Sequence, residues 1–332
     1  KVIAHFETRR ESIRKQVEET AKTIGGRPDL DEDLLDEVTA LNEWPMPVAG
    51  TFDEGFLAVP HEALVATMKG NQKYFPVFDP AGRLLNYFIT IVNLESTQPE
   101  LIREGNERVV RPRFADAKFF WEQDGKQRLE ERIAQLDDVV FQSALGSMRE
   151  KSGRVSTLAA HIADKIGGDP QLALRAGELS RCDLMTAMVF EFPEMQGIMG
   201  RYLAVRDGEP EELAEAMDEF YMPRFSGDRL PQTPTGIAIS LADRLDTLVG
   251  IFGIGMKPTG DKDPFALRRA ALGALRILRD HALPLNLKAL LAEAEEQLHG
   301  KLQQSKIADS VYAFMLERLK GLYADDGIAY DV

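Results

Sequence analysis

The sequence predicts an α+β fold that is predominantly helical, with a small antiparallel sheet near its start. Three observations predict this fold class. Short β-rich runs separated by turn residues occur within about the first third of the chain. From Glu100 onward, long segments of helix-forming residues alternate with breaks that contain Gly and Pro. The length of 332 residues is that of about two domains.

The chain is expected to begin with two helices. Residues 5–24 have the periodicity of an amphipathic helix, and Gly25-Gly26 would end it. Asp31 is a typical N-cap residue for a shorter acidic helix that extends to Leu41. These two helices precede the segments that predict strands.

A hairpin is the clearest strand signal in the first third of the chain. The β-rich runs 73–79 and 84–92 flank the turn sequence Asp79-Pro80-Ala81-Gly82. Shorter strands are expected at 47–52 and 56–59, and a turn or two of helix at 61–68. These runs together predict a small antiparallel sheet.

The rest of the chain is expected to be almost entirely helical. Breaks at 167–170, 208–210 and 224–234 separate the segments, because Gly ends helices and Pro seldom lies inside them. Helices are predicted at residues 98–106, 114–123, 126–136, 140–149, 152–166, 170–181, 183–190, 194–204, 210–219, 235–250, 264–281, 286–298 and 303–324. We expect a mixed domain at 1–136, a helical domain at 137–260 and a helical extension at 261–332.

The composition is that of an ordinary globular protein with an acidic balance. A net charge of -14 argues against attraction of the whole surface to nucleic acid, but not against a local basic patch. Cys182 is the single cysteine, so an intrachain disulfide is excluded and a reducing, cytoplasmic location is expected. No apolar run approaches the ~20 residues of a membrane helix, so no membrane partner is expected. Because the chain begins at Lys1 and not at Met, we expect it to be a fragment of a longer protein.

One segment, residues 256–281, is basic within this acidic chain. It holds six Lys and Arg residues against three Asp residues, a local charge of six minus three, or +3. Asp263-Pro264 is a typical helix start, because Asp accepts the free N–H groups of the first turn and Pro needs no donor there. The segment therefore predicts a Gly-containing loop that leads into a helix over 264–281.

The basic segment offers the groups that commonly contact phosphate. Lysine and arginine side chains, a hydroxyl and loop N–H groups beside a helix N-terminus are typical of such contacts. The candidate phosphate-contacting residues are Lys257, Thr259, Lys262, Arg268, Arg269 and Arg276. Arginines also flank the buried stripe of ordinary surface helices, so spacing alone leaves both interpretations open.

Residues 150–183 form a second constellation, in which two predicted helices flank a Gly-Asp-Pro break. This arrangement resembles the core of the HD metal-dependent phosphohydrolases, which bind metal through a His, a His-Asp pair and a later Asp. The matching positions here are Lys151, Cys182, Asp183 and Asp243. A lysine ammonium would repel a divalent ion, and a thiolate suits zinc better than the hard ions of phosphate chemistry. We therefore predict an HD-like domain over 137–260 whose degenerate site holds no metal.

Residues 256–278, MKPTGDKDPFALRRAALGALRIL, closely resemble a signature of the beta subunit of bacterial heterotetrameric glycyl-tRNA synthetase. Asp261 stands where that family has Ser. Further stretches that resemble the family lie at 56–93, 105–124, 191–204 and 231–255, so the resemblance covers essentially the whole chain.

The resemblance implies a non-catalytic, tRNA-binding subunit of an aminoacyl-tRNA ligase. It implies that a separate alpha subunit, with ATP and Mg, attaches glycine to tRNA(Gly), and that the two subunits form an alpha2beta2 heterotetramer. It implies no catalytic residue, no metal and no cofactor in this chain, and an anticodon-binding domain beyond it.

Two alternatives stay open from the sequence. A metal bound at Asp183 and Asp243, with nucleotide turnover, would indicate an HD-type phosphohydrolase. A chain that holds the alpha subunit without touching tRNA would be a structural scaffold. The tRNA-binding hypothesis differs from both, because it predicts an RNA affinity that falls steeply with salt.

Overall fold

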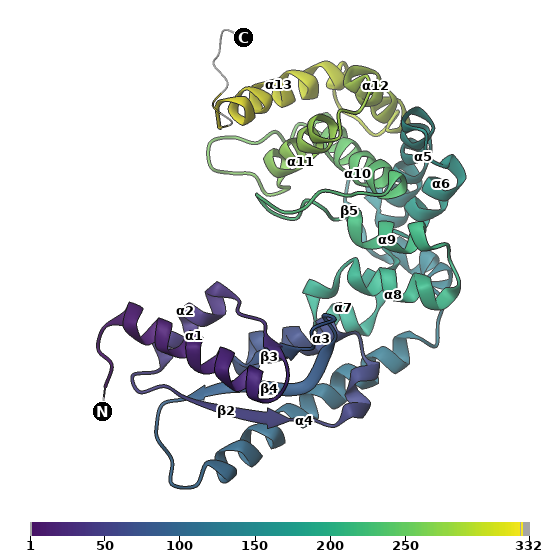
Figure 1. The fold of residues 1–332 in the computed structure, drawn as a ribbon. Helices are drawn as coiled ribbons and strands as arrows, with labels where there is room; N and C mark the ends of the chain where they lie inside the picture. Colours follow the sequence, from purple (N-terminus) through teal and green to yellow (C-terminus); the bar gives the residue numbers. More distant parts are fainter. Residues whose placement is uncertain (1, 326, 328–332) are drawn as a thin grey trace. The chain divides into compact units, whose positions relative to one another are not determined.

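The computed structural model describes residues 2–325 and 327, which form two compact units. Unit 1 holds the residues up to Asp124 together with Glu191–Met195 (Figure 1). Unit 2 holds Gly125–Phe190 and the residues from Gln196 onward.

The expected domain boundaries at residues 136 and 260 do not coincide with the division between these units. The division after Asp124 lies earlier, and residues 137–260 share unit 2 with the described part of 261–332, except for the short segment 191–195. Residues 326 and 328–332 of the expected extension lie outside the described residues.

Unit 1 is built on a four-stranded antiparallel sheet in the order β1-β3-β4-β2. The strands are β1 (Arg27–Pro28), β2 (Met46–Thr51), β3 (Phe75–Phe78) and β4 (Leu84–Val92). The α-helices are α1 (Phe6–Thr23), α2 (Glu32–Leu41), α3 (His61–Ala66) and α4 (Pro99–Asp124). Apolar side chains of α1, α2, β3 and β4 form one buried core, with Ile13, Leu35 and Phe75 fully buried.

The predicted hairpin is confirmed. β3 and β4 pair in antiparallel register, and the Asp79 carboxylate accepts hydrogen bonds from the backbone N–H groups of Ala81 and Arg83, both at 2.9 Å. Gly82 has a φ of 79°, a left-handed conformation that favours glycine. The turn residues therefore fix the strand connection as the sequence predicts.

Two expectations for unit 1 are wrong. The predicted strand at 56–59 lies largely within a 3-10 helix, Glu54–Ala58, whose first turn is capped by Asp53. The separate helices at 98–106 and 114–123 are one helix, α4, with Pro112 inside it. Proline removes one hydrogen bond from the helix but does not end it here.

A π-helical turn, Thr67–Gln72, continues α3, and a short 3-10 turn, Pro193–Met195, also belongs to this unit.

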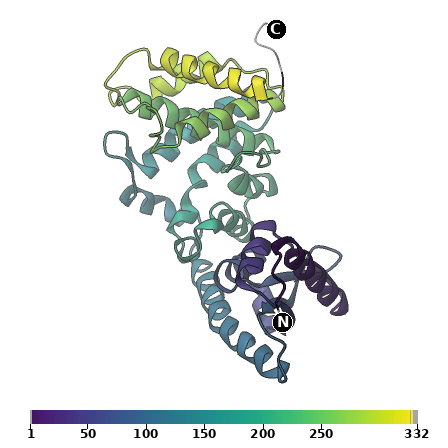
Figure 2. The same ribbon diagram turned by 90° about the vertical axis from the view of Figure 1, so that its left-hand side faces the viewer.

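Unit 2 is a helical assembly around α10 (Pro234–Gly253), in which 17 of 20 residues are buried. A helix that is apolar on most sides belongs inside a protein, and α10 contacts helices from both earlier and later parts of the chain. Figure 2 shows the teal, green and yellow helices of this unit gathered together. The other helices are α5 (Met148–Ile166), α6 (Pro170–Leu179), α7 (Ala187–Glu191), α8 (Ile198–Asp207), α9 (Glu211–Glu219), α11 (Leu267–Asp280), α12 (Leu287–Gln297) and α13 (Ile307–Asp325).

Three expectations for unit 2 are corrected. The predicted helix at 140–149 is mostly a short hairpin of β5 (Val140–Gln142) and β6 (Gly146–Ser147), because Ser147 forms a capping box with Glu150 and starts α5 there. The predicted helix at 126–136 is a 3-10 helix, Glu130–Asp138. A further 3-10 helix, Cys182–Met185, follows α6.

The third correction concerns the helix expected at 264–281, which begins only at Leu267 as α11.

Among the described residues, no helix combines the length and the apolar composition needed to cross a bilayer.

Candidate nucleic-acid interface

The loop before α11 is held by its own backbone. Thr259 and Lys262 exchange two hydrogen bonds, of 3.1 and 2.9 Å, between their N–H and C=O groups. Gly260 lies inside this tight turn with a φ of 50°. The N–H groups of Thr259 and Lys262 therefore bind each other's carbonyl groups, whereas both side chains are exposed.

The N-terminus of α11 is closed by a carboxylate. Asp263 accepts hydrogen bonds from the N–H groups of Leu267 at 2.8 Å and Arg268 at 2.9 Å. Asp263 therefore accepts first-turn amides as expected, but the expected helix start at Asp263-Pro264 is wrong: the N-cap residue is Ala266, and Pro264 lies in the loop. Two of the first-turn amides that the sequence offers for phosphate, those of Leu267 and Arg268, therefore already have a carboxylate partner.

The six candidate residues differ in how far they are already engaged. Lys262 and Arg269 are exposed, and no hydrogen bond or ion pair to another described residue holds either side chain. Lys257 lies 5.5 Å above the centroid of the Phe252 ring. These three cations lie on the loop and the first turn of α11, where a polyanion could reach them.

The other two arginines brace the protein itself. Arg268 donates to the carbonyl of Gly260 and holds the loop against the start of α11. Arg276 donates to the carbonyl of Asp228, at 2.9 Å, and holds the loop that precedes α10. The contact of Arg276 with Asp228 joins residues 48 positions apart, so the sequence could not indicate it.

The four HD-like positions also lie in unit 2, but they do not form one ligand set. Lys151 is 1% exposed, and its Nζ lies 2.9 Å from Asp246 Oδ2 and 3.1 Å from Asp243 Oδ1. Its ammonium also donates to the Thr247 hydroxyl at 2.7 Å and faces the Phe141 ring at 4.5 Å. A cation carried on the chain therefore lies between the two carboxylates.

Two arginines complete this arrangement, which we call the buried ion cluster: Lys151, Arg154, Arg181, Asp243 and Asp246. Arg154 binds both carboxylate oxygens of Asp246, at 2.6 and 3.2 Å. Arg181 binds Asp243 Oδ1 at 2.5 Å. Burial alone would raise the pKa of Asp243, but the charges of Arg181 and Lys151 outweigh it and hold that pKa well below its usual range.

Cys182 and Asp183 lie beside this cluster without joining it. Burial raises the pKa of the Cys182 thiol to about 12, so the side chain is an uncharged thiol at neutral pH. Burial also raises the pKa of Asp183 to about 6, although its carboxylate accepts a 2.6 Å hydrogen bond from Gly197 N–H. Within the described residues, no three His, Cys, Asp or Glu side chains are arranged to hold a metal ion.

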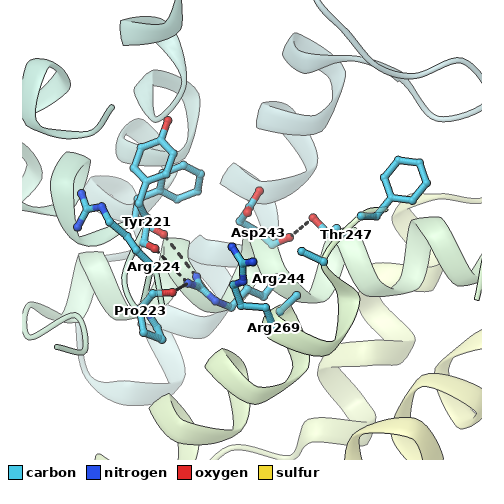
Figure 3. A pocket seen from close by; sticks show the side chains of 11 residues that line it. Tyr221, Pro223, Arg224, Asp243, Arg244, Thr247 and Arg269 are labelled. Carbon is cyan, nitrogen blue, oxygen red and sulfur yellow. Dashed lines mark hydrogen bonds between the residues drawn. The ribbon is translucent and has the colours of Figure 1, made fainter. Parts of the chain in front are cut away.

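A pocket of about 390 Å³ opens next to the buried ion cluster (Figure 3). Arg224, Arg244 and Arg269 line it together with Asp243 and Thr247. Arg244 is 8% exposed and donates to backbone carbonyls, including those of Tyr221 at 3.3 Å and Pro223 at 3.1 Å. Burial lowers the pKa of Arg244 to about 10, so the guanidinium remains charged at neutral pH.

Sequence reasoning missed four residues of this region: Arg181, Asp246, Arg244 and Arg224. Asp246 follows Asp243 by three residues on one predicted helix, so helical periodicity could have placed it on the same face. Arg181 directly precedes the Cys182-Asp183 pair, and its charge was a readable signal. Arg244 acts through contacts with the irregular segment 220–223, and Arg224 acts through hydrogen bonds to Asp218 and Asp228. No sequence signal indicated these contacts.

Comparison with known proteins identifies the family. A family model described as glycyl-tRNA synthetase beta subunit matches residues 1–332. Proteins named glycine–tRNA ligase beta subunit are similar along the chain: 53% identical over 331 residues in Klebsiella pneumoniae subsp. pneumoniae, and 54% in Sodalis glossinidius and in Salmonella arizonae. Each comparison covers 100% of this chain and 48% of the relative, so the chain spans about half the length of the curated relatives it matches. The chain therefore belongs to the glycyl-tRNA synthetase beta subunit family.

Proposed function

We propose that this chain is the tRNA-binding, non-catalytic part of a glycyl-tRNA synthetase beta subunit. It would bind tRNA(Gly) while a separate alpha subunit, with ATP and Mg, attaches glycine to that tRNA. We place this enzyme in the cytoplasm, as a heterotetramer of two alpha and two beta subunits. Family membership supports the assignment to the ligase.

The tRNA-binding part of the proposal rests on exposed cations without carboxylate partners in the basic segment, residues 256–281. Lys262 and Arg269 are exposed and have no partner among the described residues, and Lys257 is exposed beside them. An exposed cation without a carboxylate partner can neutralise a phosphate and release its counterions. The chain as a whole is strongly acidic, so this segment is where a polyanion would be attracted.

The buried ion cluster supports a non-catalytic role. Lys151 donates to Asp246 and lies 3.1 Å from Asp243, where a metal phosphohydrolase would use its carboxylates on a divalent ion. We propose that residues 137–260 keep an HD-like helical arrangement in which this ammonium supplies the positive charge. The chemistry of the donor set speaks against the phosphohydrolase alternative, because lysine must lose its proton before it can bind a metal.

The test replaces Lys262 and Arg269 by alanine in the complete two-subunit enzyme. Each lost phosphate contact lowers the slope of log affinity against log salt by roughly 0.7 to 0.9, so the double variant is expected to lose roughly 1.4 to 1.8. Binding of tRNA(Gly) is measured between 50 and 200 mM salt, a range over which a phosphate contact changes the affinity several-fold.

Lys165→Ala is the control, because Lys165 is an exposed cation of unit 2 that lies on α5, outside the basic segment, and already has Asp164 as a carboxylate neighbour at 3.8 Å. It should leave the salt slope unchanged. If the double variant kept both the affinity and the salt slope of the wild type, the assignment of this surface to tRNA would be wrong. If tRNA bound nowhere on the chain while the alpha subunit still did, the scaffold alternative would replace the proposal.

A further inference from the structure

A groove lies on the side of α11 that faces the loop between α9 and α10. Its volume is about 450 Å³, and its walls include Phe225 and Gly227 from that loop and Arg269, Leu272 and Arg276 from α11. We call it the Phe225 groove. It adjoins the pocket beside the buried ion cluster, since Pro223 and Arg269 line both.

Phe225 is exposed in a way that packing does not explain. Its side chain is 63% accessible, and Leu272 on the facing helix is 36% accessible. Phe225 and Leu272 together form a small exposed apolar patch in this groove, and an apolar patch rimmed by polar groups is a candidate binding surface. The aromatic face is available for stacking because the loop places it outside the core of unit 2.

The loop that carries Phe225 is held firmly on both sides. Arg224 pairs with Asp218 at 2.6 Å, and its N–H group donates to the Asp228 carboxylate at 2.6 Å. Arg276 donates to the Asp228 carbonyl from α11. The ring is therefore presented on a braced loop, which lowers the entropy lost when a ligand stacks on it.

The charges around the ring select the kind of ligand. Arg269 has no partner among the described residues, and Arg276 has a carbonyl partner but no carboxylate among them. An exposed aromatic ring flanked by unneutralised guanidinium groups is the arrangement with which proteins bind single-stranded nucleic acid. A fully paired duplex would leave Phe225 unused, since its bases are already stacked inside the helix.

We propose that the Phe225 groove binds an unpaired nucleotide of the RNA, whose base stacks on Phe225 while its phosphates contact Arg269 and Arg276. This inference rests on the proposed function, that the chain binds tRNA, and adds that one contact is to an unstacked base. Stacking of a base on an aromatic side chain contributes through its apolar face, so it depends little on base identity or on salt.

The test measures the binding of two RNAs to the complete two-subunit enzyme: tRNA(Gly), and a blunt-ended RNA duplex without unpaired nucleotides. Phe225→Ala is expected to weaken tRNA binding by roughly five- to a hundredfold, the loss that one stacked base contributes. The salt slope should remain that of the wild type, and duplex binding should not change. Phe225→Trp should restore tRNA binding, because it keeps an aromatic face.

Arg269→Ala should weaken the binding of both RNAs and reduce the salt slope, because phosphates occur in both. The matched control is Phe119→Ala, which removes a ring that is 55% exposed in unit 1. It should leave the binding of both RNAs unchanged.

The outcomes separate this inference from the proposed function. If Arg269→Ala weakened tRNA binding and Phe225→Ala did not, the chain would bind tRNA and the stacking inference would be overturned. If neither variant changed tRNA binding, the Phe225 groove would not be an RNA site and the inference would be overturned, whereas the proposed function would still be decided by the double variant of Lys262 and Arg269. If Phe225→Ala released the alpha subunit and left tRNA binding intact, the groove would be a protein interface and the inference would again fail.

Discussion

Removal of the Lys151 ammonium should cost less stability than removal of the Asp246 carboxylate beside it. The buried ion cluster holds three cations and two carboxylates, a net charge of three minus two, or +1. Lys151→Met makes that balance zero, because Arg154 still pairs with Asp246 and Arg181 still pairs with Asp243. Asp246→Asn raises it to +2 and leaves Lys151 and Arg154 without their closest carboxylate.

The expected magnitudes follow from the contacts. Lys151→Met removes short hydrogen bonds to Asp246 and Thr247, which contribute about 1 to 3 kcal/mol to the free energy of unfolding. Asp246→Asn leaves two buried cations inadequately paired, for which about 3 to 5 kcal/mol is typical. The double variant should lose less stability than the sum of the losses in the two single variants, because Lys151→Met removes a cation that Asp246→Asn leaves unpaired.

Urea unfolding monitored by circular dichroism measures these differences, with the transition of unit 2 analysed separately if the units unfold apart. Arg149→Ala is the matched control, because its ion pair with Asp137 is about half exposed and should contribute less than about 1 kcal/mol. The reasoning would be refuted if Lys151→Met destabilised the protein as much as Asp246→Asn, or if the double variant were as unstable as the sum of both.

Three further predictions concern other groups of unit 2. The pKa of Asp183 in the folded protein is about 6, against an ordinary 3.8, so between these pH values the folded protein holds a proton that the unfolded chain has lost. The free energy of unfolding should therefore fall as pH rises from 4 to 6, by on the order of 3 kcal/mol. Asp183→Asn should flatten that pH profile in urea unfolding, and an unchanged profile would show that another group titrates. Cys182 is buried with a pKa near 12, so a thiol reagent should modify it only after unfolding; rapid modification of the native protein would contradict its burial. Asp263→Ala removes the acceptor of the Leu267 and Arg268 N–H groups and should destabilise α11 by about 1 to 2 kcal/mol, seen as faster amide exchange in its first turn, whereas unchanged exchange would refute the cap.

The sequence predicted those parts of the fold that are determined by interactions between neighbouring residues. The turn at residues 79–82 was predictable, because the Asp79 side chain and the left-handed conformation of Gly82 determine the hairpin between β3 and β4. The prediction of a helix over 140–149 was wrong, again because of a local interaction. Ser147 and Glu150 form a capping box that starts α5, and a window that averages over both sides of the cap conceals it.

The candidate site was predictable only in part, because its residues become functional or structural through distant contacts. The resemblance to the HD phosphohydrolases predicted that Lys151 and Asp243 belong to one site, and the structure places Lys151 Nζ 3.1 Å from Asp243 Oδ1. Spacing did not show that Arg276 would donate to Asp228 or that Phe225 would lie across from α11. The assignment of phosphate contacts to individual residues stays a prediction.

The Lys151 ammonium also bears on how unit 2 depends on its surroundings. A cation covalently attached to α5 cannot dissociate, be chelated or be exchanged for a competing ion. At the junction between α5 and α10, the carboxylates of Asp243 and Asp246 are therefore paired with a cation of the chain itself as soon as the chain folds. We therefore expect the integrity of this junction to be independent of the supply of divalent ions, although the ligation reaction proposed for the enzyme uses ATP with magnesium.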